Sequence, residues 1–159
     1  MIDEVIYEIS KTENCRILSI DEIRKIPYLK NKRNVIEIDT DLSSESGYVP
    51  VILYLTLENA ELPSIYINED SYETIKFVPH VNQNFSICIV EDESISFFEA
   101  NLPKISKYFI HKAKEILTIK SSDKETEFKD ELKDYWEIKY NGKRIINEVG
   151  VDEIFNVVK

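Results

Sequence analysis

The chain has 159 residues, of which 43% are hydrophobic, and it includes seven Phe, nine Tyr and one Trp. This length and composition predict one folded domain with a substantial core, and they argue against a disordered or low-complexity chain. The formal net charge is −10, which disfavours binding to nucleic acid or an anionic membrane because phosphates would be repelled, although the acidity can also serve solubility alone.

The first part of the chain is expected to contain two short helices. Residues 2–9 place apolar side chains along one side of an amphipathic helix. Ser19 and Glu22 form a capping-box pattern, which predicts the start of a second helix that Pro27 limits. Between these two helices, residues 15–18 could form a strand that enters the second helix.

The next part of the chain is rich in strand signals. Residues 34–40 alternate apolar and acidic side chains, as expected for a half-buried strand. Residues 49–57 are rich in β-branched and aromatic side chains and predict a central strand, and residues 63–68 predict a third, short strand. The turns expected at residues 43–47 and 58–62 are short, so the pattern indicates an antiparallel meander, because parallel strands need long crossovers.

The second half of the chain is expected to begin irregularly and to become helical. Residues 68–84 read as an irregular stretch that precedes the short apolar run of residues 86–90. Residues 121–123 would cap a helix that runs to Trp136, and Asn141 and Gly142 predict a hairpin turn. Pro103 opens the strongest helical pattern, whose apolar stripe should face the sheet. The residues of this stripe are Ile105, Tyr108, Phe109, Ala113, Ile116 and Leu117.

One cysteine stands beside residues that could support acyl-transfer chemistry. Cys88 lies within an apolar run, and the turn just before it carries His80 and Asn82. A nucleophilic thiol needs access and a polar group that steadies the developing oxyanion, and an asparagine amide is a neutral donor for that purpose. The alternative is that Cys88 is a buried strand cysteine and that His80 only holds the turn. A cysteine hydrolase would need a base close to the thiol, for which His80 is the only plausible candidate.

The remaining cysteine, histidine and acidic side chains give weaker indications of function. The chain has two cysteines and two histidines, and their spacing predicts no metal site. The start of the chain lacks a secretion signal and no apolar run is long enough to span a membrane, so a cytoplasmic, reducing location with both cysteines as thiols is expected. Cys15 is expected to be structural and His111 to be solvated. Residues 91–93 are acidic and read mainly as a solvated loop, although they could orient an attacking amine.

The segment PHVNQNFSICIVED, residues 79–92, resembles the active-site segment of the bacterial branch of the ubiquitin-conjugating enzyme family. In that family a His-Pro-Asn turn precedes a cysteine that forms a thioester. The resemblance therefore implies catalytic roles for His80, Asn82 and Cys88. The chain departs from the family pattern at Val81, where eukaryotic members have Pro, and at Phe85, where most members have Gly.

The resemblance also implies a fold and an activity. The fold would be α+β and ubiquitin-conjugating-like (UBC-like), with an antiparallel four-stranded meander flanked by helices and a helical C-terminal half. Residues 1–159 would form a single conjugating domain with a core of about 1–120 and a helix and hairpin extension of about 121–159. The activity would be that of a transferase that links Cys88 to the C-terminal glycine of a protein as a thioester and passes it to a nucleophile. The alternatives are a catalytically silent binding module of the same fold and a conjugating domain excised from a larger fusion protein.

Residues 127–136 also look like a segment that follows the conjugating domain in bacterial proteins, often before a fused activating-like domain. Free-standing members of this type occur in bacterial antiphage systems that make cyclic-oligonucleotide signals (CBASS). Their implied role is to link the C-terminus of the cyclic-oligonucleotide synthase (CD-NTase) to another molecule. The expected partners are thus the C-terminus of a CD-NTase or of a ubiquitin-like protein, together with an activating-enzyme-like protein. Neither a cofactor nor a metal is expected, and neither nucleic acid nor a membrane is an expected partner.

Overall fold

The computed structural model describes most of the first 118 residues of the chain, which belong to one unit, Met1–Ile119. The described ranges are residues 2–44, 47–58, 62–75, 78–89 and 101–118. The helix and hairpin predicted beyond residue 120 lie outside these ranges, as do residues 91–93. Within the described part of the chain, no helix is long and apolar enough to cross a membrane.

Four strands form one antiparallel sheet in the order β1-β2-β3-β4, so each strand pairs with its neighbour in sequence. The strands are β1 (Asn14–Ile17), β2 (Val35–Ser44), β3 (Gly47–Thr56) and β4 (Ser64–Ile67). This confirms the predicted four-stranded meander. The turn predicted at residues 43–47 was too long, because Ser43 pairs with Tyr48 and Ser44 with Gly47. Gly47 has a φ of 126°, which a glycine adopts without steric cost.

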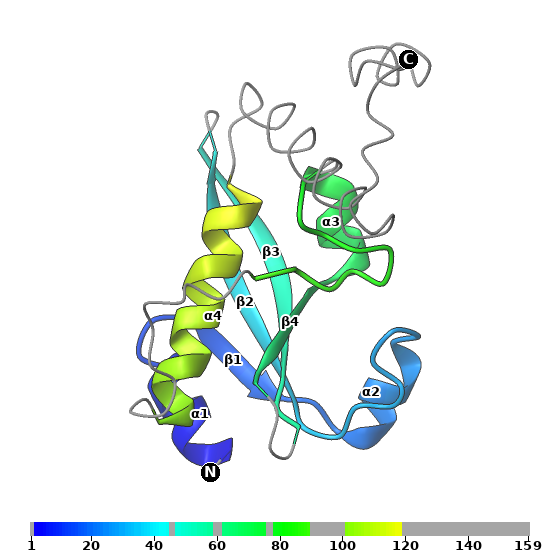
Figure 1. Ribbon diagram of the computed structural model, residues 1–159, viewed down its shortest axis with the longest axis vertical. Helices are drawn as coiled ribbons and strands as arrows, with labels where there is room; N and C mark the ends of the chain where they lie inside the picture. The colour runs from blue at the N-terminus through cyan, green and yellow to red at the C-terminus, as the bar shows by residue number, and fades with distance from the viewer. Residues whose placement is uncertain (1, 45–46, 59–61, 76–77, 90–100, 119–159) are drawn as a thin grey trace, which may run out of the picture. The chain divides into compact units, whose positions relative to one another are not determined.

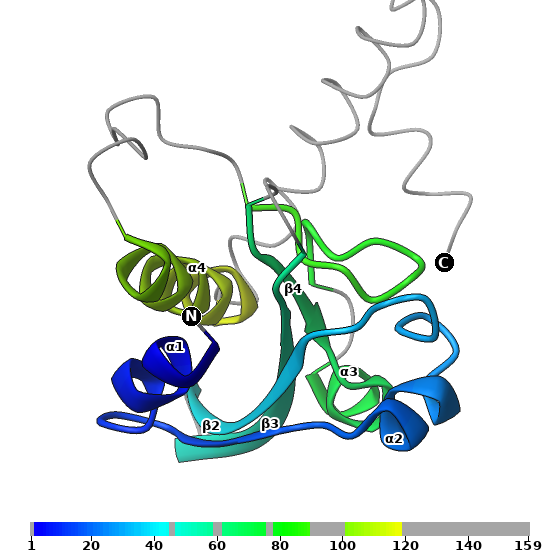
Figure 2. The ribbon, with the colours of Figure 1, turned by 90° about the horizontal axis from the view of Figure 1, so that it is seen from below.

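Helices cover both faces of this sheet. Figure 2 shows α1 and α4 on one side of the curved sheet and α2 and α3 on the other. The helices are α1 (Ile2–Ile9), α2 (Ile20–Lys25), α3 (Glu69–Ile75) and α4 (Leu102–Leu117). The predicted capping box starts α2, because the Ser19 side chain accepts from the Glu22 N–H while the Ser19 N–H donates to Glu22 Oε2 at 2.8 Å. Pro103 lies in the first turn of α4, as predicted.

Helix α3 shows that the prediction of an irregular stretch over residues 68–84 was wrong for its first half. Asn68 starts the helix, since its Oδ1 accepts from the Ser71 N–H at 3.2 Å and its carbonyl oxygen accepts from the Tyr72 N–H at 2.8 Å. Acidic side chains at Glu69 and Asp70 favour this helix start. The helix is short and only Ser71 is buried in it, so it carries almost no apolar periodicity to detect.

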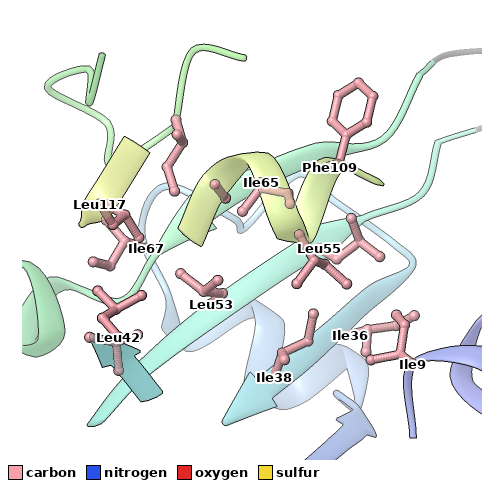
Figure 3. Packing of buried hydrophobic residues seen from close by; sticks show 14 of the residues in the cluster. Ile9, Ile36, Ile38, Leu42, Leu53, Leu55, Ile65, Ile67, Phe109 and Leu117 are labelled. Atoms are coloured by element: carbon pink, nitrogen blue, oxygen red, sulfur yellow. The ribbon is translucent and has the colours of Figure 1, made fainter. Parts of the chain in front are cut away.

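The main core lies between the sheet and the helices α1 and α4 (Figure 3). Alternate residues of β2, β3 and β4 point into it, as a period of two requires. These residues are Ile36, Ile38, Leu53, Leu55, Ile65 and Ile67. Helix α4 contributes Ile105, Phe109, Ala113 and Leu117 as predicted, together with Ile110, whereas Tyr108 and Ile116 are only partly buried. A smaller cluster on the opposite face contains Leu18, Ile23, Leu29, Val35, Tyr54 and Tyr66.

Candidate active site

The three predicted site residues lie on a short hairpin, residues 80–88, which we call the site hairpin. Its two arms run antiparallel, because the Cys88 N–H donates to the His80 carbonyl at 2.7 Å and the Asn82 N–H donates to the Ser86 carbonyl at 2.9 Å. A bridge between Val81 and Ile87 completes this register. The chain therefore brings His80 opposite Cys88 and Asn82 opposite Ser86.

The register divides the side chains of the site hairpin between two faces. Ile87 is 6% exposed and belongs to the main core, and Val81 packs against that core. Asn82 and Cys88 are exposed, and because neighbouring residues of an extended segment point to opposite faces, these two side chains belong to the other face. His80 lies in the turn just before the first arm. One face thus anchors the hairpin while the other carries its polar and sulfur groups.

The site hairpin is attached to the edge of the sheet at β4. The Ile67 N–H donates to the Phe85 carbonyl at 2.9 Å, and the Ile87 N–H donates to the Ile65 carbonyl at 2.8 Å. These bonds extend the sheet by a further short segment, which runs in green beside β4 in Figures 1 and 2. Backbone pairing on this side holds the hairpin in a fixed position relative to the core.

Cys88 is exposed, so the alternative of a buried strand cysteine is wrong. Cys15, by contrast, is partly buried, and its Sγ lies 3.8 Å from the Ile6 carbonyl oxygen. Burial raises the pKa of the Cys15 thiol, and the nearby Glu13 carboxylate raises it further. A raised thiol pKa lowers the fraction of thiolate, which is the nucleophilic form. Cys15 is therefore less accessible than Cys88, and its thiol is less ionised than that of an ordinary cysteine.

A chain of hydrogen bonds holds the Asn82 amide. Its Nδ2 donates to Ser86 Oγ at 2.9 Å, and Ser86 Oγ donates in turn to Asn84 Oδ1 at 2.8 Å. An amide group has two N–H donors, so the bond to Ser86 leaves the second one for a bound group. In the register of the hairpin, Asn82 and Cys88 are diagonal neighbours across the two arms.

Ser86 and Asn84 are site residues that the sequence reasoning missed. The signal that could have found them is the polar run Asn82-Gln83-Asn84, followed after one residue by Ser86. Asn and Ser side chains often bond to groups two to four residues away in turns. Such a run beside a candidate oxyanion donor predicts that the donor is oriented by its neighbours.

Two residues of the site hairpin have left-handed backbone conformations, His80 and Phe85, each with a φ of 62°. For a residue with a Cβ atom this conformation costs on the order of 1–2 kcal/mol. At His80 it directs the carbonyl oxygen toward the Cys88 N–H. His80 therefore has a definite part in the turn through its backbone.

Phe85 is packed on two sides by aromatic rings. The ring centroids of Tyr28 and Phe85 lie 5.0 Å apart at an interplanar angle of 49°, and those of Tyr72 and Phe85 lie 5.7 Å apart, edge to face. Aromatic pairs in these arrangements contribute about 0.5–1.5 kcal/mol each. Phe85 thus has a backbone conformation that glycine favours, while its ring gains two partners.

The remaining titratable residues of interest lie away from the site hairpin. His111 is exposed on α4, with Nε2 3.2 Å from Glu115 Oε1, as expected for a surface residue. Among the residues that the structure describes, no group of three or more His, Cys, Asp or Glu side chains could hold a metal ion.

Comparison with known proteins places the chain in a family. A family model described as prokaryotic E2 family B matches residues 21–145. This range includes β2, β3, β4 and the whole site hairpin. No curated protein and no solved structure gave a match.

Proposed function

The chain belongs to prokaryotic E2 family B, and we propose that it is a conjugating enzyme in which Cys88 carries an acyl group as a thioester. Membership of the family implies a conjugating-enzyme-like function with protein partners. The observation that carries the finer proposal is the exposed Cys88, on the same hairpin face as an Asn82 amide held by Ser86.

The first step would be a thioester exchange. The Cys88 thiolate attacks the carbonyl carbon of a protein C-terminus that is already activated as a thioester on an activating-enzyme-like protein. A new C–S bond forms to Cys88, and the donor C–S bond breaks as the donor thiolate leaves. Cysteine thiols are partly ionised near neutral pH and are strong nucleophiles, so this step needs no dedicated base.

The second step would pass the acyl group to an amine. The amine attacks the thioester carbonyl, a C–N bond forms, and the bond to Cys88 breaks to return the thiolate, while the amine proton goes to solvent. In both steps the carbonyl oxygen gains negative charge in the tetrahedral intermediate. The free N–H donor of Asn82 would stabilise that charge, a contribution of about 2.7–4 kcal/mol in comparable sites.

The acyl donor proposed here is the C-terminal glycine of a protein, either a CD-NTase or a ubiquitin-like protein. The support for the CD-NTase, and with it for a part in antiphage defence, is the resemblance of residues 79–92 to the active-site segment of bacterial conjugating enzymes, a type whose free-standing members occur in antiphage systems. An exposed thiol agrees with a macromolecular donor, because a protein tail can reach it without entering a closed cavity.

The proposal is tested by expressing the chain together with its neighbouring genes and measuring intact mass. Wild-type protein should gain a mass of protein size that thiol reagents remove, and the Cys15→Ala variant should gain it equally. The Cys88→Ala variant should not. A thiol-labile adduct that survives in Cys88→Ala would refute the assignment of the nucleophile.

A further inference from the structure

We propose that Tyr28 is a positioning residue of the active site, whose ring holds Phe85 in the left-handed conformation on which the shape of the site hairpin depends. The inference rests on the proposed function of Cys88 and Asn82. Tyr28 lies in the turn that follows α2, far from the site in sequence. Its hydroxyl bond and ring contacts reach Ile67, Tyr66 and Phe85 rather than the thiol or the Asn82 amide, so its effect on the site passes through Phe85.

Tyr28 and Phe85 are tied to the same residue of β4. The Tyr28 hydroxyl donates to the Ile67 carbonyl oxygen at 3.3 Å, and the Ile67 N–H donates to the Phe85 carbonyl oxygen at 2.9 Å. The rings of Tyr28 and Phe85 also pack against each other, with their centroids 5.0 Å apart. Ile67 is fully buried and is held by its pairing with β3. Both Tyr28 and Phe85 are therefore bonded to a rigid part of the sheet.

The backbone of Phe85 needs this support. Side chains with a Cβ atom rarely adopt a φ of 62°, and such residues persist only where the surroundings determine their conformation. Tyr28 packs on one side of the ring, and Tyr72 from α3 meets it edge to face at 5.7 Å. The two tyrosines therefore supply the contacts that favour this conformation over an ordinary extended one.

The conformation of Phe85 determines where Asn82 and Ser86 lie. The Phe85 N–H donates to the Asn82 carbonyl at 2.8 Å and so closes the turn, and the next residue, Ser86, pairs with Asn82 through both backbone and side chain. A rotation about the N–Cα bond of Phe85 would move Ser86 away from the Asn82 amide. The oxyanion donor would then lose its orientation, while the exposed Cys88 thiol would remain accessible.

The Tyr28 hydroxyl keeps its proton under ordinary conditions. Burial raises the pKa of this phenol, with a smaller contribution from the neighbouring Tyr54. The hydroxyl therefore remains a donor to Ile67 across the pH range in which conjugation would be measured. Since the ring also stacks on Tyr66 at 6.2 Å, its plane is fixed independently of the hydroxyl.

The test compares three variants: Tyr28→Ala, Tyr28→Phe, and Tyr28→Ala combined with Phe85→Gly. The first readout is hydrogen exchange of the Asn82 and Cys88 amides, whose N–H groups make the hairpin bonds. The second readout is the rate of thioester discharge to an amine. Thermal unfolding shows that each variant is folded. If Tyr28→Ala does not fold, Tyr28→Leu gives the same comparison, because it keeps apolar volume without a flat ring.

Tyr28→Ala should speed the exchange of both amides and slow discharge by about tenfold, the upper range of what an aromatic pair contributes. Tyr28→Phe keeps the ring and should stay within about threefold of wild type, since a single neutral hydrogen bond contributes little net free energy. Adding Phe85→Gly to Tyr28→Ala should restore about threefold or more of the lost rate, because glycine adopts a positive φ without steric cost.

Unchanged amide exchange in a folded Tyr28→Ala variant would overturn the inference, as would a loss in Tyr28→Phe as large as that in Tyr28→Ala. A failure of Phe85→Gly to restore any discharge would also count against it, since a merely structural loss would not be repaired in this way. These results are separable from a failure of the proposed function. If wild type forms no thioester on Cys88, that function is refuted, while the amide exchange still decides the role of Tyr28.

Discussion

Replacing Asn82 with alanine should slow acyl transfer far more than it destabilises the fold. The Asn82 side chain is exposed, and the bond that it donates to Ser86 Oγ at 2.9 Å is also exposed to solvent. Such a bond contributes about 1 kcal/mol or less to the free energy of unfolding. The backbone bond from the Asn82 N–H to the Ser86 carbonyl survives the substitution. Loss of one oxyanion donor costs about 2.7–4 kcal/mol, or roughly 100- to 1,000-fold in rate.

The assay is single-turnover discharge of a preformed Cys88 thioester to a primary amine, with urea unfolding measured on the same preparations. Asn82→Ala should discharge at least about 100-fold more slowly while its free energy of unfolding falls by about 1 kcal/mol or less. Ser86→Ala is the matched control, because it removes the partner that orients the amide but leaves the donor in place. Its discharge should therefore fall by a smaller factor, about tenfold or less.

The two effects must separate for the reasoning to stand. If Asn82→Ala loses stability and activity in equal measure, Asn82 only holds the turn. If the discharge rate is unchanged, the amide does not stabilise the oxyanion. A loss in Ser86→Ala as large as that in Asn82→Ala would mean that the Ser86 hydroxyl has a direct part in the chemistry.

Three further predictions follow from burial and charge. A maleimide reagent at neutral pH should label Cys88 much faster than Cys15, because Cys88 is exposed and burial raises the pKa of Cys15; equal rates in the two single-cysteine variants would contradict this. Hydrogen bonds from Ser19, and then from Arg16, lower the pKa of Glu22 from 4.5 to about 2. The ionised Glu22 carboxylate should thus stabilise the fold above about pH 4.5, and this stabilisation should be lost as the pH falls toward 2. In urea unfolding, the free energy of unfolding of Glu22→Gln should therefore fall less steeply than that of wild type between these two pH values. Phe109 is 6% exposed in the main core, and Phe109→Ala should lower the free energy of unfolding by about 3–5 kcal/mol in urea, whereas a loss below about 1 kcal/mol would show that this core can collapse around the cavity.

Much of the fold could be predicted because its signals are local. Apolar residues alternate along β2, a capping box begins α2 at Ser19, and Pro103 opens α4. Helix α3 escaped prediction because its cap at Asn68 is a single residue and its length offers little apolar periodicity. Short polar helices depend on such caps and on tertiary packing, which a single sequence does not display.

The three candidate site residues were named from the sequence and lie on one hairpin, but the geometry of that hairpin could not be predicted. Their catalytic roles stay a prediction. The resemblance predicted that His80, Asn82 and Cys88 act together, and an amide donor beside a thiol indicated acyl-transfer chemistry. The pairing of the two hairpin arms depends on positive φ values at His80 and Phe85. Neither histidine nor phenylalanine predicts a positive φ in a sequence. The contact that supports Phe85 comes from Tyr28, and a contact between residues so far apart in sequence has no local signal.

If Cys88 is the nucleophile, as proposed above, its exposed position suits a carrier better than a hydrolase. A cysteine hydrolase gains from a fixed base and an enclosed site, whereas an acyl carrier must be reached in turn by a donor protein and by an acceptor. The site hairpin meets the second need, because it is attached to the sheet on one side through Ile65 and Ile67 and presents Cys88 on its exposed side. Because the Cys88 thiol is exposed, the choice of acceptor would depend on surfaces of the partner proteins rather than on a pocket that encloses the amine. The rigid part of the chemistry would then be limited to the orientation of Asn82, which is where the substitutions proposed above act.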